Sequence, residues 1–426
     1  MKTPFPAPTP RTLADWLAYI ERQHPKSIEL GLDRVREVAM RMRLERPARQ
    51  VVTVAGTNGK GSTVAFIESI ARAAGWKVGA YTSPHLLAYN ERVRIEGVDA
   101  ADDALVAAFD AVEAARGETP LTYFEYGTLS ALWLFQRSDL DLAVLEVGLG
   151  GRLDAVNLVD ADVAVITTVD LDHQDWLGND REAIGREKAG IARAGRPLVL
   201  GEDDPPSSVL GRAYAIGASA IRAGCDFFFE PLEGDRWQWR EVGYEIDLPT
   251  PRLAAPAQLR NAATAVAGLR ALAEEIPEAA YAQGVADAQL PGRLQRFTRD
   301  GVEVFVDVAH NPQAARELAT WLQRTPATGR TIAVFAALGD KDITGIVAAV
   351  AEGIDAWFVG GLADAAPRGL PLKAFAERLR GTVAARGEGF DTVAQALDAA
   401  LEQANGGDRV VVFGSFYTAA AALGRL

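Results

Sequence analysis

Short apolar runs rich in β-branched residues alternate along the chain with alanine-rich stretches. The apolar runs predict strands at Val51–Ala55, Leu140–Val147, Val163–Val169, Pro197–Leu200, Val302–Val308, Thr331–Ala336, Ala356–Val359 and Arg409–Phe413. The alanine-rich stretches predict helices that include Ser62–Ala74, Ala104–Ala115, Glu182–Ala194, Gln258–Glu275, Gln313–Gln323 and Thr392–Glu402. Strands that alternate with helices favour doubly wound α/β folds with mostly parallel sheets, and continuous apolar strands favour sheets covered on both faces.

Two segments interrupt this rhythm. Asp226–Leu248 is aromatic, alternates between apolar and polar residues and contains a Gly-Asp turn, which predicts a small antiparallel hairpin or meander. Gln289–Thr298 carries a Pro-Gly pair just before a new strand and predicts a domain boundary. We therefore expect an N-terminal domain over residues 1–290, with its antiparallel region at 226–250, and a smaller C-terminal Rossmann-like α/β domain over residues 291–426.

Composition narrows the class of protein. The chain has 426 residues, of which 49% are hydrophobic and 24% charged, as expected for roughly two to three soluble globular domains. The net charge of −13 argues against a general nucleic-acid binder, although local amides and cations can still bind small anions. A single cysteine excludes an intrachain disulfide and points to a reducing compartment. No apolar run suits a signal peptide or a membrane span, so we expect a cytoplasmic protein.

A glycine-rich loop follows the first predicted strand. Residues 51–63 read VVTVAGTNGKGST, so a strand leads through Gly, Asn and Lys60 into a helix. Backbone amides and a helix N-terminus in this context bind phosphate, and the lysine adds a positive charge. Val54 and Gly61 depart from the standard P-loop pattern. A glycine-rich turn without a ligand is the alternative, but the combination favours nucleotide binding and a P-loop ATPase-like N-terminal domain.

Acidic and histidine residues follow two further strands. Glu146 ends an apolar run, where it needs a cation or a partner such as Arg152. Asp170, Asp172 and His173 follow the next run, and imidazole beside carboxylates suits a metal site. The GLGGRLD segment also resembles a dinucleotide fingerprint, but its acid comes too soon after the glycines, so an oxidoreductase is disfavoured.

Other polar residues near strand ends are more ambiguous when each is taken alone. Ser83 precedes a proline and would be a turn residue, although its hydroxyl suits a hard cation. Lys188 would be an exposed charge on a helix. Asp307 and His310 leave the first strand of the predicted C-terminal domain, and a ligand in an interdomain cleft could be reached from there.

The ordered set of motifs resembles the folylpolyglutamate synthase/dihydrofolate synthase family, within the ATP-dependent Mur-type amide ligases, and is most similar to its bifunctional bacterial members. The motifs are HPKSIELGLDRV, VAGTNGKGST, YTSPHLLAYNERVR, YFE, EVGLGGRLDAVN, DHQDWLG, EKAGI, RNAATA, PGRLQ, DVAHNP and GDKD. Each motif is weak alone, but together they cover nearly the whole chain in order. In this family the glycine after the loop lysine is the ordinary pattern.

The resemblance implies roles for named residues. Lys60, Glu146, His173 and Lys188 are the implied catalytic residues, and Lys188 is implied to be carbamylated. One Mg²⁺ is implied at Ser83 and Glu146, and a second at Glu146, His173 and the Lys188 carbamate. The implied ATP-binding residues are Gly56, Thr57, Asn58, Gly59, Lys60, Gly61, Ser62, Asn261, Arg293 and Asp307.

The resemblance also implies the substrate sites. The pterin is expected at Ser27, Ile28, Glu29, Leu30, Thr122, Tyr123, Phe124, Glu125, Leu153, Asp154 and Ala155. The incoming glutamate is expected at His310 and Ser415, in a C-terminal glutamate ligase domain. The loop Ser83–Arg92 is expected to cover the pterin.

The implied activity is ATP-dependent addition of L-glutamate to dihydropteroate and to reduced folates through an acyl phosphate. The expected ligands are ATP, two Mg²⁺ and the folate substrates, with K⁺ as a further candidate. No nucleic-acid or membrane partner is expected, and the chain is expected to be a monomer. Two alternatives stay open: a Mur-type ligase acting on a nucleotide-sugar carboxylate, and a P-loop regulatory NTPase.

Overall fold

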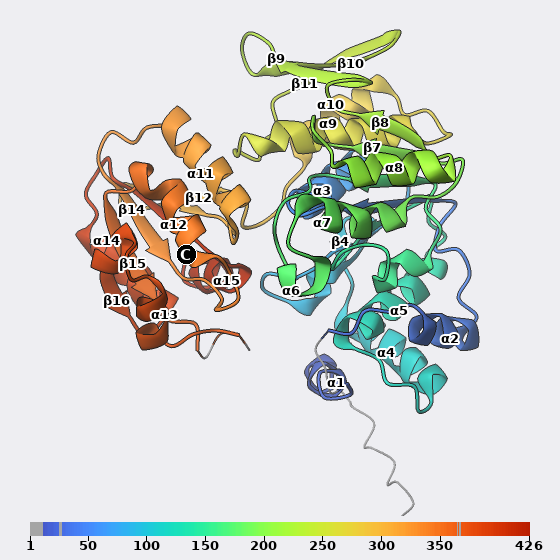
Figure 1. The fold of residues 1–426 in the computed structure, drawn as a ribbon, viewed down its shortest axis with the longest axis horizontal. Coiled ribbons are helices and arrows are strands. Elements are labelled where there is room, and N and C mark those ends of the chain that lie inside the picture. Colours follow the sequence, from blue (N-terminus) through green and yellow to red (C-terminus); the bar gives the residue numbers. More distant parts are fainter. Residues whose placement is uncertain (1–11, 25–27, 364, 366–367) are drawn as a thin grey trace, which may run out of the picture. The chain divides into compact units, whose positions relative to one another are not determined.

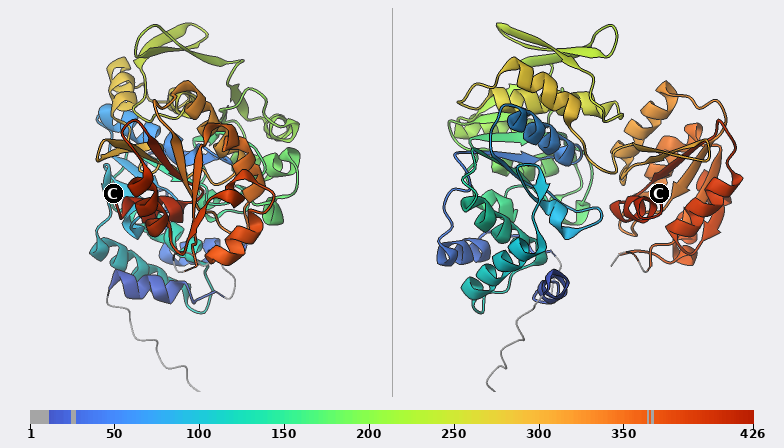
Figure 2. Two further views of the ribbon diagram at one scale, coloured as in Figure 1. Left: turned by 90° about the vertical axis from the view of Figure 1, so that its left-hand side faces the viewer. Right: turned by 180° about the vertical axis from the view of Figure 1, so that it is seen from behind.

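The computed structural model describes residues 12–24, 28–363, 365 and 368–426, which form two compact units (Figures 1 and 2). The first unit comprises Met1–Ser83, Asn90–Leu248 and Ala263–Val285. The second comprises Pro84–Tyr89, Pro249–Ala262 and Ala286–Leu426. The sequence suggested one cut between residues 290 and 291, whereas each unit gathers three separate segments. Two short segments from the N-terminal part of the chain therefore pack with the C-terminal part.

The first unit is built on an eight-stranded sheet of described residues in the order β4-β3-β2-β5-β1-β6-β7-β8. The six strands β2, β5, β1, β6, β7 and β8 pair in parallel with their neighbours, and β3 and β4 extend the sheet beyond β2 by antiparallel pairing. The strands are β1 (Gln50–Ala55), β2 (Val78–Tyr81), β3 (Val93–Ile95), β4 (Val98–Asp99), β5 (Leu142–Glu146), β6 (Val163–Ile166), β7 (Pro197–Leu200) and β8 (Ser219–Arg222). Every residue of β1, β5 and β6 is buried, which explains their continuous apolar sequences. The predicted mostly parallel sheet is confirmed.

Helices surround this sheet. They are α1 (Leu13–Ile20), α2 (Asp33–Met42), α3 (Lys60–Ala73), α4 (Asp102–Arg116), α5 (Tyr123–Gln136), α6 (Gln174–Leu177), α7 (Arg181–Lys188), α8 (Ser207–Ile216), α9 (Ala257–Arg270) and α10 (Glu278–Asp287), with short 3₁₀ turns η1 (Tyr89–Arg92), η2 (Ala155–Leu158) and η3 (Ala189–Ile191). Helix α5 was not predicted, because its apolar residues lie all round the helix and give no clear period. None of the helices in the described residues has the length and apolar character that a membrane crossing requires.

A three-stranded antiparallel sheet interrupts the α/β pattern, as the sequence predicted. It is formed by β9 (Phe227–Pro231), β10 (Arg236–Glu241) and β11 (Tyr244–Pro249), with β10 in the centre. It lies along the top edge of the first unit in Figure 1. The buried Trp239 indole donates to the carbonyl of Ala263 at 3.1 Å, so this sheet is anchored to α9.

The second unit has a six-stranded sheet of described residues, ordered β12-β13-β17-β14-β15-β16, in which only the β12–β13 pair is antiparallel. Its strands are β12 (Gln295–Arg299), β13 (Val302–Val306), β14 (Thr331–Phe335), β15 (Ala356–Gly360), β16 (Glu388–Phe390) and β17 (Arg409–Phe413). Alternate residues such as Phe305 and Val304 enter two separate apolar cores.

Helices cover both faces of this second sheet. Helices α11 (Pro312–Arg324), α12 (Ile343–Val350) and α13 (Leu372–Arg378) contribute to one core, and α14 (Val393–Gln403) and α15 (Phe416–Leu423) to the other. Two 3₁₀ turns, η4 (Ala351–Gly353) and η5 (Val383–Arg386), complete the unit. The predicted C-terminal α/β architecture is confirmed, with a core on each side of the sheet as its continuous apolar strands require.

Candidate active site

The glycine-rich loop, which we call the phosphate loop (Gly56–Ser62), joins β1 directly to α3. Gly59 caps α3 with φ +84°, a left-handed conformation that favours glycine. A Cβ atom placed on Gly56 would lie 1.8 Å from Thr167 Oγ1, so no larger residue fits there without a shift. Glycine is therefore favoured at position 59 by its positive φ and at position 56 by the lack of space for a side chain. The loop leads into a helix N-terminus, as a phosphate site needs.

Residues after β6 hold the phosphate loop in place. The Thr57 amide donates to the Thr168 carbonyl at 2.8 Å, and the Asp170 amide donates to Thr57 Oγ1 at 3.0 Å. The Asn58 amide donates to Thr168 Oγ1 at 3.1 Å. The Lys60 ammonium reaches back over the loop and donates to the carbonyl of Gly56 at 3.0 Å. The residues that follow β6 thus hold the phosphate loop that follows β1, and the Lys60 side chain lies across this loop.

Ser83 and Glu146 meet at the ends of two adjacent strands. Glu146 ends β5 and Ser83 lies two residues beyond β2, and these strands pair in parallel. The Ser83 amide donates to Glu146 Oε2 at 3.2 Å, and Glu146 is only 4% exposed. Arg152, the alternative partner considered for Glu146, forms an ion pair with Glu187 at 2.9 Å.

Lys188 is buried, so its interpretation as an exposed helix charge is wrong. It ends α7 and is only 3% exposed. Burial and, to a smaller extent, the neighbouring Lys60 charge together lower the pKa of Lys188 to about 7, against the opposing effect of Asp172. Because the Lys60 and Lys188 charges interact, the two lysines belong to one site. Near neutral pH a large fraction of Lys188 is an uncharged amine.

His173 lies in the loop after β6 and caps α6 in a left-handed conformation, with φ +51°. Its Nε2 atom is 3.9 Å from Asp172 Oδ2. Asp172 in turn acts on the charge of Lys188, which links the two predicted metal ligands. Within the described ranges 12–24, 28–363, 365 and 368–426, no three His, Cys, Asp or Glu residues are grouped as a metal site.

The segments predicted to bind the pterin come together around Arg34. The Arg34 guanidinium forms ion pairs with Glu29 at 2.8 Å and with Glu125 at 3.0 Å. Glu125 also closes a capping box with Thr122 at the start of α5. The Gly31 amide, next to Leu30, donates to the Leu153 carbonyl at 3.3 Å. Ser27, also predicted here, lies outside the described residues.

Arg34 was missed in the sequence because a charged residue on a helix gives no signal of its role. Its partner Glu125 lies 91 residues further along the chain. Glu202 was missed as well, because a single acidic residue in a loop gives no sign of its partners in the fold. It follows β7 and accepts a hydrogen bond from the Val169 amide at 3.1 Å, and burial raises its pKa to about 7.

Asp154 is a deeply buried polar group among the predicted pterin residues. Its carboxylate accepts hydrogen bonds from the amides of Leu149 at 2.8 Å and Val156 at 2.9 Å. Burial nevertheless raises the pKa of Asp154 to about 7, because these amides only partly replace water. The carboxyl is therefore able to carry or release a proton near neutral pH.

Aromatic residues at the start of α5 line the same region. A Cβ atom on Gly148 would lie 2.7 Å from the Phe124 ring, so that glycine allows the ring to pack closely. The Phe124 and Tyr81 rings are 5.9 Å apart, and the Arg92 guanidinium lies 5.5 Å from the Tyr123 ring centre. Flat apolar rings beside a hydrogen-bonding carboxyl suit a planar heterocycle. The remaining predicted residues, Ile28 and Ala155, lie beside these segments in the chain.

In the second unit, the predicted residues gather at the end of β13. The Asp307 carboxylate accepts from the amides of Leu294 at 2.9 Å and Ala309 at 2.8 Å. Burial raises the pKa of Asp307, while the nearby Arg293 charge opposes the shift. The Arg293 guanidinium lies 5.3 Å from the Phe416 ring centre, and the His310 ring lies 6.0 Å from the same ring. Phe416 thus contacts two predicted residues, Arg293 and His310, although the sequence assigned it no role of its own.

Ser415 and Asn261 have structural partners of their own. Ser415 caps α15, and its Oγ atom accepts from the Thr418 amide at 3.0 Å. The Asn261 amide group donates to Gln258 Oε1 at 3.1 Å, and Asn261 is buried within α9. Asn261, Arg293, Asp307, His310 and Ser415 all belong to the second unit, whereas the phosphate loop belongs to the first.

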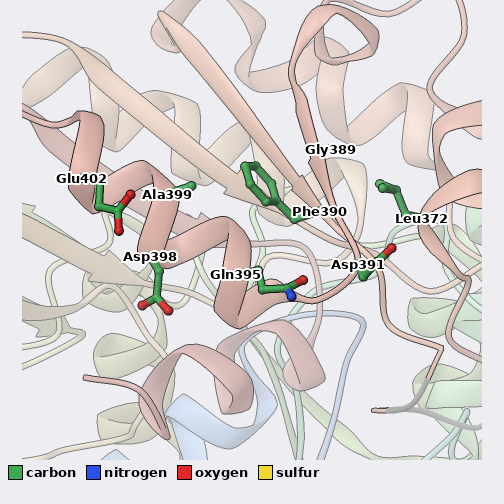
Figure 3. Close-up of a pocket in the computed structure, with 8 residues that line it drawn as sticks. All are labelled: Leu372, Gly389, Phe390, Asp391, Gln395, Asp398, Ala399 and Glu402. Carbon is green, nitrogen blue, oxygen red and sulfur yellow. The ribbon is translucent and has the colours of Figure 1, made fainter.

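A surface pocket of about 420 Å³ lies elsewhere in the second unit (Figure 3). Figure 3 shows side chains of α14 and of the end of β16 around it, including three carboxylates, Asp391, Asp398 and Glu402. Asp398 is already paired with Arg425 at 2.8 Å. The pocket contains none of the predicted site residues, and its negative charge does not suit anionic substrates.

Comparisons with known proteins match both units. Residues 54–249 match the Mur ligase middle domain, and residues 292–416 match the Mur ligase glutamate ligase domain. The dihydrofolate synthase/folylpolyglutamate synthase of Escherichia coli is 49% identical over 409 residues, which cover 96% of this chain and 94% of that relative. The protein of the same description from Haemophilus influenzae is 40% identical, and the match covers 96% of each of the two chains.

Solved structures agree with these sequence matches. The structure of E. coli FolC in complex with DHPP and ADP is 47% identical, with a TM-score of 0.92 and 98% of each chain covered. A bifunctional folylpolyglutamate synthase/dihydrofolate synthase with Mn, AMPPNP and L-glutamate bound is 45% identical, with a TM-score of 0.90 and coverage of 98% of this chain and 99% of the other. Since similarity at this level spans both units, the chain belongs to the dihydrofolate synthase/folylpolyglutamate synthase family of Mur-type ligases.

Proposed function

We propose that the chain is an ATP-dependent ligase that joins L-glutamate to 7,8-dihydropteroate and adds further L-glutamates to reduced folates, with release of ADP and phosphate. One observation carries this proposal. The phosphate loop, the Ser83–Glu146 hydrogen bond and the buried Lys188 are grouped at the carboxyl ends of the strands of the first sheet. The family supports it, because similar structures contain ADP with DHPP, or AMPPNP with L-glutamate.

The residues at this edge fit a divalent cation. Glu146 is a buried carboxylate at a strand end, and a cation would balance the charge that burial leaves on it. The Ser83 hydroxyl, His173 and the Lys188 carbamate would complete the ligands, which explains why no cluster of three acids or histidines is required. A similar structure contains Mn, and we propose Mg²⁺ at two sites in this chain. Bound there, the cations would neutralise negative charge on the phosphates.

Lys188 can become an anionic ligand through reaction with carbon dioxide. The lone pair of its neutral nitrogen forms a bond to the carbon, one C=O electron pair moves to oxygen, and a nitrogen proton leaves to solvent. The product is a carbamate with two oxygen ligands for a hard cation. Because burial and Lys60 lower the pKa of Lys188 to about 7, the reactive neutral amine is available near neutral pH.

The proposed reaction has two steps. A substrate carboxylate oxygen bonds to the γ-phosphorus of ATP while the bond to the β,γ-bridging oxygen breaks, giving an acyl phosphate and ADP. The glutamate nitrogen then bonds to the acyl carbon, phosphate leaves with the C–O electron pair, and the nitrogen loses a proton. Lys60, the phosphate-loop amides and Arg293 would counter the charge on the triphosphate. Asn261 and Asp307 would contact the nucleotide, and His310 and Ser415 the incoming glutamate.

The pterin would lie against the segments joined by Arg34. Ring packing by Tyr123 and Phe124, and hydrogen bonds from Asp154, suit the planar heterocycle of a folate. The capping box at Thr122 and Glu125 fixes the start of α5, so these rings are held on a rigid element. The monomeric state, the cytoplasmic location and the K⁺ requirement stay predictions from the sequence.

The test is product analysis by mass spectrometry after incubation with ATP, Mg²⁺, L-glutamate and either dihydropteroate or tetrahydrofolate, with phosphate release measured in parallel. We expect ADP, phosphate and a product one glutamate heavier, only when both the folate and glutamate are present. Strong phosphate release with ATP alone would support a regulatory NTPase instead. Turnover only with a nucleotide-sugar carboxylate would support the other ligase alternative.

A further inference from the structure

An arginine–glutamate pair connects the helix after the phosphate loop to the segment that carries Ser83. Arg94 lies in β3, and Glu68 lies on α3. The Arg94 Nε and Nη2 atoms donate to Glu68 Oε2 at 3.0 and 2.7 Å. The two side chains are only 16% and 7% exposed. A shielded, two-pronged pair of this kind fixes geometry more firmly than a surface ion pair.

The third nitrogen of Arg94 reaches both ends of the loop that contains Ser83. Its Nη1 atom donates to the Glu91 carbonyl at 3.1 Å and to Thr82 Oγ1 at 3.4 Å. The Thr82 amide donates to the Arg92 carbonyl at 2.9 Å, so the two ends of the loop are also bonded to each other. The chain leaves the first unit after Ser83 and re-enters it at Asn90, so Arg94 lies where both crossings occur.

Ser83 directly follows Thr82, the residue to which Arg94 is hydrogen-bonded. Its amide donates to Glu146, and the Arg94 charge interacts with Glu146 as well. On the far side of Ser83, the segment Pro84–Tyr89 is part of the second unit, and Leu86 packs against an apolar core there. The hydrogen bonds to Thr82 therefore fix the residue that immediately precedes Ser83, where the chain passes from the first unit to the second.

We propose that Glu68 and Arg94 are positioning residues, which hold Ser83 and Glu146 in register with the phosphate loop. This inference rests on the proposed function, because Ser83 and Glu146 are the proposed cation ligands. Glu68 supplies the link to the phosphate loop, since α3 begins at Lys60. Neither residue touches substrate in this proposal. Their effect is on the affinity and order of the site, and a purely structural ion pair would leave both unchanged.

The test measures cation binding without turnover. Glu68→Gln keeps the side-chain shape but loses its charge, and Arg94→Lys keeps the charge but loses the fork. The matched control is Glu241→Gln, which removes the charge from a similar pair, in which Arg270 Nε donates to Glu241 Oε1 at 2.7 Å. Mn²⁺ binding is followed by electron paramagnetic resonance with a nonhydrolysable ATP analogue. Hydrogen–deuterium exchange is measured for the peptide that covers residues 82–94.

We expect each of the two variants to weaken Mn²⁺ binding by about 10-fold and to speed amide exchange at Thr82 and Ser83. The control variant should bind Mn²⁺ as the parent chain does. Circular dichroism identifies any variant that fails to fold, and Arg94→Lys then carries the test if Glu68→Gln is unfolded. Parental Mn²⁺ affinity in the folded variants, or equal weakening in the control, would overturn the positioning role. Absence of product from the parent chain would instead contradict the proposed function.

Discussion

The charge of Lys60 acts directly on Lys188, although one lysine starts the helix after the phosphate loop and the other ends α7. The half-buried Lys60 ammonium repels the positive charge of the buried Lys188, so the proton on Lys188 is held less tightly. ATP phosphates would draw Lys60 toward themselves and reduce this repulsion. The protonation of Lys188 would therefore change when a nucleotide occupies the phosphate loop.

The first prediction is that activity depends on carbon dioxide. The pKa of Lys188 is lowered from 10.5 to about 7, so the neutral amine that forms a carbamate becomes scarce as the pH falls below about 7. We expect chain freed of carbon dioxide at pH 6 to lose most of its turnover and to regain it with bicarbonate at pH 8. A carbamate resonance in ¹³C NMR with labelled bicarbonate is the independent measurement.

Lys188→Arg is the matched variant for this prediction, because it keeps a cation that cannot form a carbamate. It should be inactive at every bicarbonate concentration. The lowered pKa also affects stability: between about pH 7 and 10.5 the unfolded chain binds more protons than the folded chain, so Lys188 makes stability rise with pH in this window. Full activity of Lys188→Arg would disprove the carbamate.

The second prediction concerns Glu146→Gln. The amide oxygen can still accept from the Ser83 amide, so the fold is preserved, but the buried negative charge is lost. We expect turnover to fall by about 10²- to 10³-fold, with much weaker Mn²⁺ binding in titrations. The control is Glu303→Gln on β13, which alters an exposed ion pair with Arg296 on β12. Unchanged Mn²⁺ affinity in Glu146→Gln would show that the cation is held elsewhere.

Sequence patterns predicted the parallel sheets and the phosphate loop because both are local signals. An apolar run, a glycine pair and a helix with a lysine at its start lie within 13 residues of Val51. The short strands β3, β4 and β16 were not predicted, since they are partly exposed and gain their order from a neighbouring strand. The same distinction applies to the site.

Lys188 illustrates what local patterns lack. A lysine at the end of a helix is exposed by default, and only the packing of α7 against the rest of the first unit buries it. The motif resemblance, not its own surroundings in the sequence, pointed to its role. Arg34 and Glu68 belong to the same class, because each contacts a residue far along the chain, Glu125 at 91 residues and Arg94 at 26 residues. Their importance arises only when the sheet assembles.

The third prediction tests the close approach at Gly56. A methyl group there would collide with Thr167 Oγ1, so Gly56→Ala should shift the phosphate loop, weaken ATP binding at least about 10-fold and lower stability by about 1–3 kcal/mol. Gly211→Ala is the control, because a Cβ atom there meets nothing within 4 Å and the residue lies within α8. It should stabilise the chain by about 0.5–1 kcal/mol. Calorimetry of nucleotide binding and thermal unfolding separate the two effects.

The fourth prediction concerns Arg34, which joins two segments proposed to bind the pterin. Arg34→Gln leaves Glu29 and the buried Glu125 without their shared cation, so the start of α5 and the segment before α2 should separate. We expect the KM for dihydropteroate to rise by about 10-fold while the KM for ATP changes little, because the phosphate loop is held by other residues.

The matched control for Arg34 is Arg41→Gln on the same helix. Arg41 pairs with Glu37 on an exposed surface and donates to the Arg116 carbonyl at 2.8 Å, and neither partner is a predicted pterin residue. That variant should retain the parental KM for both substrates, as exposed pairs of this kind contribute at most about 1 kcal/mol. Equal increases in the two KM values for Arg34→Gln would indicate general loosening of the first unit. An unchanged KM for dihydropteroate would place the pterin away from Glu29 and Glu125, and the capping box at Thr122 would then be purely structural.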